Sequence, residues 1–189
     1  MYEIICYGLG GQGIITASKI LAAAAIFYEK KYASVGVKYG TQRRGGVVRA
    51  FVRIDDKPIF EKSLIYKPDC IVVAHPTFIE EVDITAGLKE DGVAVLNTVK
   101  DPNRIDLGVK LSRIGTLDAN KIAEEVWGVG PILLTSMPML GAFCATSRKL
   151  KLESVIDAVR RKWSGMPAER NVDAIKKACN ETKVVEFSR

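Results

Sequence analysis

Residues 8–13 read Gly-Leu-Gly-Gly-Gln-Gly and fit the pattern G-x-G-x-x-G. A short apolar run precedes these glycines, and an alanine-rich segment at residues 14–30 follows them. This order predicts a strand, a tight turn and a helix. Such a turn lets the backbone approach a phosphate group, and the helix N-terminus offers free N–H groups and partial positive charge. The segment therefore predicts a loop suited to an anionic or nucleotide-like ligand.

A dinucleotide site of this kind also needs an acidic residue about twenty positions later, which binds the ribose 2′-hydroxyl. Residues 30–40 read Lys-Lys-Tyr-Ala-Ser-Val-Gly-Val-Lys-Tyr-Gly and contain no Asp or Glu. NAD is therefore disfavoured. A free-standing oxidoreductase that binds NADP remains an alternative, with Lys38, Arg43 or Arg44 holding the 2′-phosphate.

A second glycine-rich segment follows at residues 39–46, Tyr-Gly-Thr-Gln-Arg-Arg-Gly-Gly. Arginine presents a planar fork of N–H donors to a carboxylate or a phosphate. The simplest reading is a solvated basic turn. The glycines on both sides of Arg43 and Arg44 favour a shaped anion-binding loop instead.

Composition narrows the class of protein. Of 189 residues, 48% are hydrophobic and 26% charged, which is ordinary for a globular domain with a full core. The net charge of +6 is not packed into a tail, so it suggests a basic face for an anionic ligand or an acidic partner. A non-enzymatic basic module that binds an anion or nucleic acid is thus a third alternative, although no nucleic-acid-binding signature supports it.

No metal site is expected in this chain. The four cysteines, Cys6, Cys70, Cys144 and Cys179, are far apart, whereas iron–sulfur clusters and structural zinc need clustered thiolates. No signal peptide and no apolar run long enough to span a bilayer are visible, so we expect a cytoplasmic protein with reduced thiols and no membrane contact. His75, the one histidine, ends a predicted strand. A histidine without a paired carboxylate is more often structural, and we assign no catalytic residue.

The hydrophobic pattern predicts strands alternating with helices, with strands at residues 3–8, 47–54, 69–75, 92–97 and 109–114, and helices at residues 14–30, 77–89, 119–127, 138–149, 152–163 and 172–183. Residues 55–58 are expected to turn the chain into a hairpin return at residues 59–60, and residues 164–171 to form a loop. This alternation predicts an α/β fold, a Rossmann-like three-layer sandwich whose mostly parallel sheet carries an antiparallel hairpin. We expect one α/β domain over residues 1–189, with a C-terminal helical extension over about residues 151–189.

The two glycine segments together resemble the gamma subunits of the 2-oxoacid:ferredoxin oxidoreductases. The first segment of that family reads G-x-G-G-Q-G, and the second reads Y-G or F-G followed by R-G. Gln42 departs from the pattern, since a glutamate is common there, and Ser136 stands where the family often has Asn. The matching residues, which we take as candidate cofactor-binding or interface residues together with Arg43, are Gly8, Gly10, Gly11, Gln12, Gly13, Tyr39, Gly40, Arg44, Gly45 and Gly46.

The resemblance implies a subunit of an enzyme that oxidatively decarboxylates a 2-oxoacid with coenzyme A, giving an acyl-CoA, CO₂ and reduced ferredoxin. Thiamine diphosphate, Mg²⁺ and [4Fe–4S] clusters would lie in alpha, beta and ferredoxin-like delta subunits, since their motifs are missing from this sequence. The chain would then be inactive alone. Pyruvate, the 2-oxoacid ketoisovalerate and 2-oxoglutarate all remain candidate substrates. Because two adjacent arginines between glycines add little to the stability of an isolated domain, Arg44 is expected to face a partner subunit or the coenzyme A side of a shared cleft.

Overall fold

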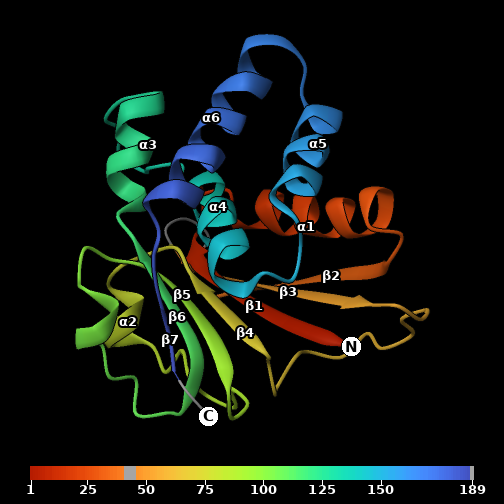
Figure 1. The fold of residues 1–189 in the computed structure, drawn as a ribbon, viewed down its shortest axis with the longest axis vertical. Helices are drawn as coiled ribbons and strands as arrows, with labels where there is room; N and C mark the ends of the chain where they lie inside the picture. Colours follow the sequence, from red (N-terminus) through yellow and green to blue (C-terminus); the bar gives the residue numbers. More distant parts are fainter. Residues whose placement is uncertain (41–45, 188–189) are drawn as a thin grey trace.

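The computed structural model describes residues 1–40 and 46–187. Within these residues the chain builds one seven-stranded sheet in the order β2-β3-β1-β4-β5-β6-β7 (Figure 1). The strands are β1 (Tyr2–Leu9), β2 (Tyr32–Tyr39), β3 (Val47–Asp55), β4 (Cys70–Val73), β5 (Gly92–Asn97), β6 (Leu111–Leu117) and β7 (Lys183–Glu186).

The centre of the sheet is parallel and its two sides are antiparallel. Strands β1, β4, β5 and β6 run parallel to their neighbours in this group, whereas β3 pairs antiparallel with both β1 and β2, and β7 pairs antiparallel with β6. The predicted α/β fold with a mostly parallel sheet and an added hairpin is therefore confirmed. The hairpin itself was placed wrongly, because β3 pairs with the preceding segment 32–39 and not with residues 59–60. The side chains of Ala33 and Val35 pack against the helix-side core, which holds β2 in place.

Most of the helices lie on one face of the sheet (Figure 1). The other face is covered by the short helix α2, a 3₁₀ turn and loops, so that third layer is thin. The helical elements are α1 (Ile14–Tyr28), α2 (Phe78–Glu81), the 3₁₀ turn Pro102–Arg104, α3 (Ala119–Trp127), α4 (Ser136–Ser147), α5 (Leu152–Lys162) and α6 (Gly165–Glu181).

Both faces of the sheet carry an apolar core, as the alternation of side chains along a strand requires. In β1, Ile4 and Cys6 join the core under the helices, while Ile5 and Tyr7 join the core on the α2 face. Strand β3 alternates in the same way, since Ala50, Val52 and Ile54 meet the helices and Phe51 meets the opposite core.

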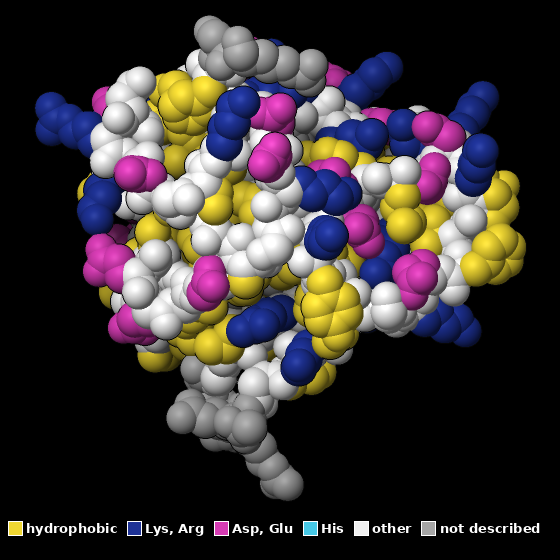
Figure 2. Space-filling model, turned by 90° about the horizontal axis from the view of Figure 1, so that it is seen from below, with side chains coloured by type: hydrophobic (Ala, Val, Ile, Leu, Met, Phe, Trp, Pro, Cys, Tyr) yellow, Lys and Arg dark blue, Asp and Glu magenta, His cyan; other side chains and the backbone are white. Residues whose placement is uncertain are grey.

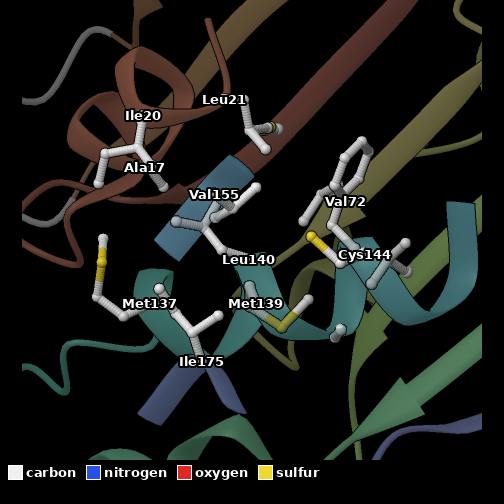
Figure 3. Close-up of a cluster of buried hydrophobic side chains, with 14 of the residues drawn as sticks. Ala17, Ile20, Leu21, Val72, Met137, Met139, Leu140, Cys144, Val155 and Ile175 are labelled. Carbon is white, nitrogen blue, oxygen red and sulfur yellow. The ribbon is translucent and has the colours of Figure 1, made fainter. Parts of the chain in front are cut away.

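Helix α4 is apolar on nearly all sides because it packs between the sheet and the outer helices. Its Met137, Leu140 and Cys144 lie among side chains of α1, β4, α5 and α6 (Figure 3). Gly141 lets α6 approach closely, since a Cβ there would overlap the carbonyl oxygen of Ile175. This packing explains why the helix carries no polar face at all.

Several predicted elements differ from the structure. The helix expected at residues 77–89 ends at Glu81. Thr77 and Glu80, whose spacing is that of a capping box, do not cap the helix, because the hydroxyl of Thr77 bonds His75 and the carboxylate of Glu80 bonds Lys100. The expected loop at residues 164–171 is largely the first part of α6, and β7 follows as an unpredicted strand.

Other helix ends follow the sequence signals. The carboxylate of Asp118 accepts a hydrogen bond from the N–H of Lys121 at the start of α3, and Gly128 ends that helix with a positive φ. Helix α4 begins two residues before Pro138. The helix predicted at residues 119–127 is thus confirmed, and Asp118 caps it through a contact between residues close in the chain.

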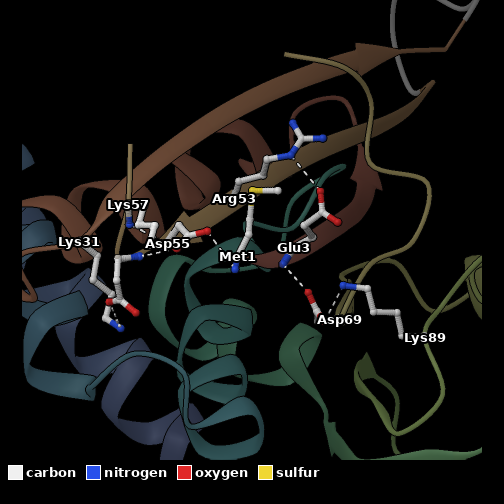
Figure 4. Close-up of polar contacts among 9 residues, drawn as sticks. Met1, Glu3, Lys31, Arg53, Asp55, Lys57, Asp69 and Lys89 are labelled. Carbon is white, nitrogen blue, oxygen red and sulfur yellow. Dashed lines mark hydrogen bonds and ion pairs between the residues drawn. The ribbon is translucent and has the colours of Figure 1, made fainter. Parts of the chain in front are cut away.

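Polar contacts join the amino end of β1 to the carboxyl end of β3 and to the start of β4 (Figure 4). Arg53 of β3, which is only 5% exposed, donates from Nε to the carboxylate of Glu3 at 2.9 Å. The carboxylate of Asp69 accepts from the backbone N–H of Glu3 at 2.7 Å and from Nζ of Lys89 at 2.8 Å. Side-chain charges therefore tie β1, β3 and the start of β4 together at this end.

Candidate binding cleft at the glycine loop

The glycine loop follows β1 at the carboxyl end of the strand and is closed by its own residues. The side chain of Gln12 folds back, and its Oε1 accepts a hydrogen bond from the N–H of Leu9 at 2.8 Å. The N–H of Gln12 in turn donates to the carbonyl of Leu9 at 3.2 Å. Gln12 is 4% exposed, and this hydrogen bond holds its side chain inside the turn.

Two glycines of the loop adopt backbone conformations that other residues rarely adopt. Gly11 has φ +101° and Gly13 has φ +86°. A Cβ on Gly13 would lie 2.5 Å from Oγ of Ser136, and one on Gly11 would lie 3.0 Å from Cδ1 of Ile132. The chain after α3 therefore packs directly on the glycine loop.

The structure brings the two glycine segments together. The N–H of Gly10 donates to the carbonyl of Gly46 at 3.1 Å, and the N–H of Gly40 donates to the carbonyl of Val47 at 2.7 Å. Both ends of the second segment thus lie beside the first. The candidate residues Arg43, Arg44 and Gly45 lie outside the described residues.

A cleft of about 290 Å³ opens between the two segments. Its walls are mostly apolar, with the first turn of α1 forming one side and the ends of β2 and β3 the other. The first N–H groups of a helix have no acceptor within the helix, and the first intrahelical bond here starts at Ala17. The lining residues are Leu9, Gly10, Gly11, Gly13, Ile14, Ile15, Thr16, Tyr39, Gly40, Gly46, Val47 and Val48. Such a cleft suits a ligand or partner segment that has both an anionic and an apolar part.

The strand order argues against a standard dinucleotide site at this loop. In the Rossmann fold the second strand lies beside the first and runs parallel to it. Here the antiparallel β3 occupies that place, and β2 lies one strand further out. In addition, the N–H of Gly10 already bonds Gly46. The NADP alternative thus loses the position where the ribose would bind.

His75 lies after β4 and is not among the residues that line the cleft. Its Nδ1 is 2.8 Å from Oγ1 of Thr77, and its ring lies against Phe78 at 5.2 Å. Burial lowers the pKa of the imidazole. These contacts place His75 at the start of α2, as part of the cover on that face of the sheet.

Two tertiary contacts were not predicted from the sequence. Asn97, 1% exposed at the end of β5, donates to the carbonyl of Ala74 at 2.8 Å and accepts from the N–H of Ala119 at 2.9 Å. Ile132 contacts Gly11 from the loop after α3. The sequence could have indicated Asn97, because a polar Asn ends an otherwise apolar strand there. Nothing in the sequence around Ile132 indicated its contact with Gly11.

The remaining surface gives few other candidates. Lys, Arg, Asp and Glu side chains intermingle on the face seen from below, without a patch of one sign (Figure 2). Across residues 1–40 and 46–187, no three His, Cys, Asp or Glu side chains gather as metal ligands would. None of the helices in those two ranges has the length and apolar character needed to cross a bilayer.

Comparison with known proteins identifies the family. Residues 3–181 match the family model described as pyruvate ferredoxin/flavodoxin oxidoreductase. The chain is 44% identical to the pyruvate/ketoisovalerate oxidoreductases common subunit gamma of Thermococcus kodakarensis, over 99% of this chain and all of that relative. It is also 44% identical to the pyruvate synthase subunit PorC of Methanocaldococcus jannaschii, over 96% of this chain and 97% of that relative.

A solved structure agrees with these relatives. The crystal structure of the pyruvate oxidoreductase subunit PORC of Thermotoga maritima matches with a TM-score of 0.82 and 31% identity, over 98% of each chain. The resemblance found in the glycine segments is thus confirmed over the whole length. The chain belongs to the pyruvate ferredoxin/flavodoxin oxidoreductase family, as a chain of the gamma-subunit type.

Proposed function

We propose that this chain is the gamma subunit of an oxidoreductase that converts a 2-oxoacid and coenzyme A into an acyl-CoA and CO₂ while reducing ferredoxin. Pyruvate is the first candidate substrate and ketoisovalerate the second, because relatives of full length are named for these acids. We further propose that the chain works in the cytoplasm with alpha, beta and delta subunits, and that it is inactive alone.

The observation that carries this proposal is the cleft between the two glycine segments. A helix N-terminus and apolar walls meet there at the carboxyl end of β1. Open α/β sheets bind ligands at this end, where successive connections leave in opposite directions. The connections after β1 and β4 leave in opposite directions, and the cleft lies at this same end of the sheet, on the side of β1 that faces β3. The cleft therefore suits the pyrophosphate and pantetheine parts of coenzyme A, or a partner segment beside them.

The arginine segment is assigned to the same cleft. Gly40 and Gly46, which bound it in the sequence, both line the cleft. We propose that Arg44, with Arg43 as its neighbour, supplies positive charge to the anionic side of coenzyme A or to a partner carboxylate. A desolvated arginine pair across such a contact costs about 2–5 kcal/mol when it is truncated.

The proposed cofactors belong to the partner subunits. Thiamine diphosphate with Mg²⁺ would supply the carbanion chemistry, and [4Fe–4S] clusters would accept the electrons. The described residues offer neither a thiolate cluster nor a group of carboxylates for these cofactors. This chain would help to bind and orient coenzyme A or the partner segment beside it, and would keep water out of the shared cleft.

Reconstitution tests the proposal. The four chains are expressed together and assayed with pyruvate, ketoisovalerate and 2-oxoglutarate, coenzyme A and a viologen dye. We expect dye reduction by the assembly and none by this chain alone. Robust dye reduction by the lone chain would refute the subunit assignment.

An arginine variant tests the cleft. In the assembly, Arg44→Ala is expected to raise the KM for coenzyme A or to weaken association about tenfold or more. Lys176→Ala, on the exposed face of α6, is the control and should change neither value. An Arg44→Ala assembly with wild-type KM and wild-type association would show that the arginine segment is a solvated turn.

A further inference from the structure

The outer side of β2 is an open sheet edge. Strand β2 is the first strand of the sheet, and β3 alone pairs with it among the described residues. It is eight residues long, carries the single charged residue Lys38 and has no proline. A long edge strand with few charges is a template for pairing with another strand.

At the opposite edge of the sheet, β7 has features that block pairing with another strand and that β2 lacks. Strand β7 has four residues, of which the first is Lys183 and the last is Glu186. Glu186 is also held in an ion pair with Arg148. Short length and charge are the usual means by which natural sheets block unwanted pairing. Of the two edge strands, β2 is therefore the one suited to pair with a further strand.

The hydrogen-bond pattern shows which groups of β2 are free to pair. The N–H of Gly40 bonds the carbonyl of Val47 across the hairpin, so position 40 points toward β3. Because this direction alternates along an antiparallel ladder, the even-numbered residues of β2 also point toward β3. The N–H and C=O groups that point outward therefore belong to Ala33, Val35, Val37 and Tyr39.

We propose that the outer edge of β2 pairs antiparallel with the same edge of a second copy of this chain. The inference does not depend on the proposed function. Outward residues must face outward residues, which restricts the register. The register that engages all four of them sets Ala33 opposite Tyr39 of the other copy and Val35 opposite Val37, with Gly36 on the two-fold axis facing its own copy.

The strand is self-complementary in this register. Lys38 faces Ser34 of the other copy, so no like charges meet. Tyr32, 49% exposed, faces Gly40 of the other copy, and Tyr39, 66% exposed, faces Ala33. Two exposed aromatic rings per copy thus meet small residues across the ladder. Self-complementarity of this kind is what a two-fold interface requires, and a different partner strand would not require it.

A disulfide tests both the partner and the register. Residues facing each other at a non-hydrogen-bonded position lie about 4.5 Å apart between Cα atoms, within the range of about 4.4–6.8 Å that a disulfide spans. Gly36 accepts a side chain, because a Cβ there would lie 3.9 Å from the Phe51 side chain. In the full chain with Cys179→Ser, Gly36→Cys is oxidised with diamide and run on a non-reducing gel.

We expect Gly36→Cys to form a covalent dimer. Ser34→Cys alone, the matched control, should form none, because the two copies of residue 34 lie far from the axis on opposite sides. A mixture of Ser34→Cys and Lys38→Cys should cross-link again. Equal cross-linking of all single variants, or none by Gly36→Cys, would overturn the proposal.

Light scattering measures the same association without a new thiol. The unmodified chain should have a dimer mass that falls on dilution. Val37→Pro, which removes an outward N–H and no bond to β3, should shift it to the mass of one chain. A single-chain mass for the unmodified protein at all concentrations would contradict the proposal. So would a Gly36→Cys chain that cross-links only to another subunit in the assembly.

Discussion

The two ends of β1 are built in opposite ways. At the amino end, charged side chains make the contacts, with Arg53 bonded to Glu3 and Asp69 bonded to both Lys89 and the backbone of β1. At the carboxyl end the contacts come from the backbone, as between Gly10 and Gly46. At the amino end of β1, side-chain contacts hold the neighbouring strands together. At the carboxyl end, glycines form backbone contacts and leave space for a cleft.

This difference separates stability from binding. A side chain placed at the carboxyl end would fill the space that a ligand needs, so the loop there is shaped by glycine conformations and by the buried amide of Gln12. Ion pairs at the far end cost no binding space. Substitutions at the amino end should therefore change stability alone, and those at the carboxyl end should change binding as well.

The largest effect is expected at the buried pair of the amino end. Arg53→Met leaves the carboxylate of Glu3, whose side chain is 16% exposed, without its partner. The free energy of unfolding should fall by about 3–5 kcal/mol, as for other broken buried pairs. Urea titration measures this. Adding Glu3→Gln to Arg53→Met should restore part of the lost stability. If Arg53→Met alone has wild-type stability, the ion pair at the amino end does not stabilise the fold.

At the carboxyl end, Gly8→Ala should cost stability and binding together. A Cβ on Gly8 would overlap the side chain of Ile14, the first residue of α1, and so push the helix N-terminus away from the cleft. We expect a loss of about 1–3 kcal/mol, typical of overpacking, together with weaker coenzyme A binding in the assembly. Gly130→Ala is the control, since its nearest neighbour, the carbonyl of Ile132, lies 3.9 Å away. If Gly8→Ala binds coenzyme A as the wild type does, the glycine loop is not part of the binding site.

A loss of stability of the same order is expected from Gln12→Ala. It removes the acceptor of the Leu9 N–H, and an unsatisfied buried group costs about 1–3 kcal/mol. Thermal unfolding checks the loss of stability. Gln12→Glu keeps the acceptor oxygen and should recover most of it. If Glu and Ala are equally destabilising, the amide acts through some contact other than the bond to Leu9.

The smallest effect concerns pH, at a residue outside both ends. Burial lowers the pKa of His75 in the folded chain below its ordinary value of 6.5. As pH falls through 6.5, the unfolded chain binds a proton that the folded chain does not, so stability falls. His75→Gln should make the free energy of unfolding flatter between pH 7 and the lower folded pKa. An unchanged slope would mean that other groups set the pH dependence.

Local chemistry made several features readable from the sequence. The glycine segment at residues 8–13, the Asp118 cap and the alternation of β3 each depend on residues near one another in the chain. The family resemblance rested on such segments, and it held over the full length. The prediction of a helix at residues 77–89 was wrong because contacts outside the local pattern intervene. His75 and Lys100 bond the side chains of Thr77 and Glu80, which would have capped the helix.

The sequence by itself therefore determined the α/β class, the loop that ends β1 and the family. Only the tertiary structure decided that β2 is the hairpin partner of β3 and that Gly46 lies beside Gly10. It also decided that Asn97 joins the end of β4 to the start of α3, and that Ile132 lies against Gly11. Apart from the β2–β3 hairpin, those contacts join residues far apart in the sequence. Their energies depend on how the helices and strands pack, which no local pattern encodes.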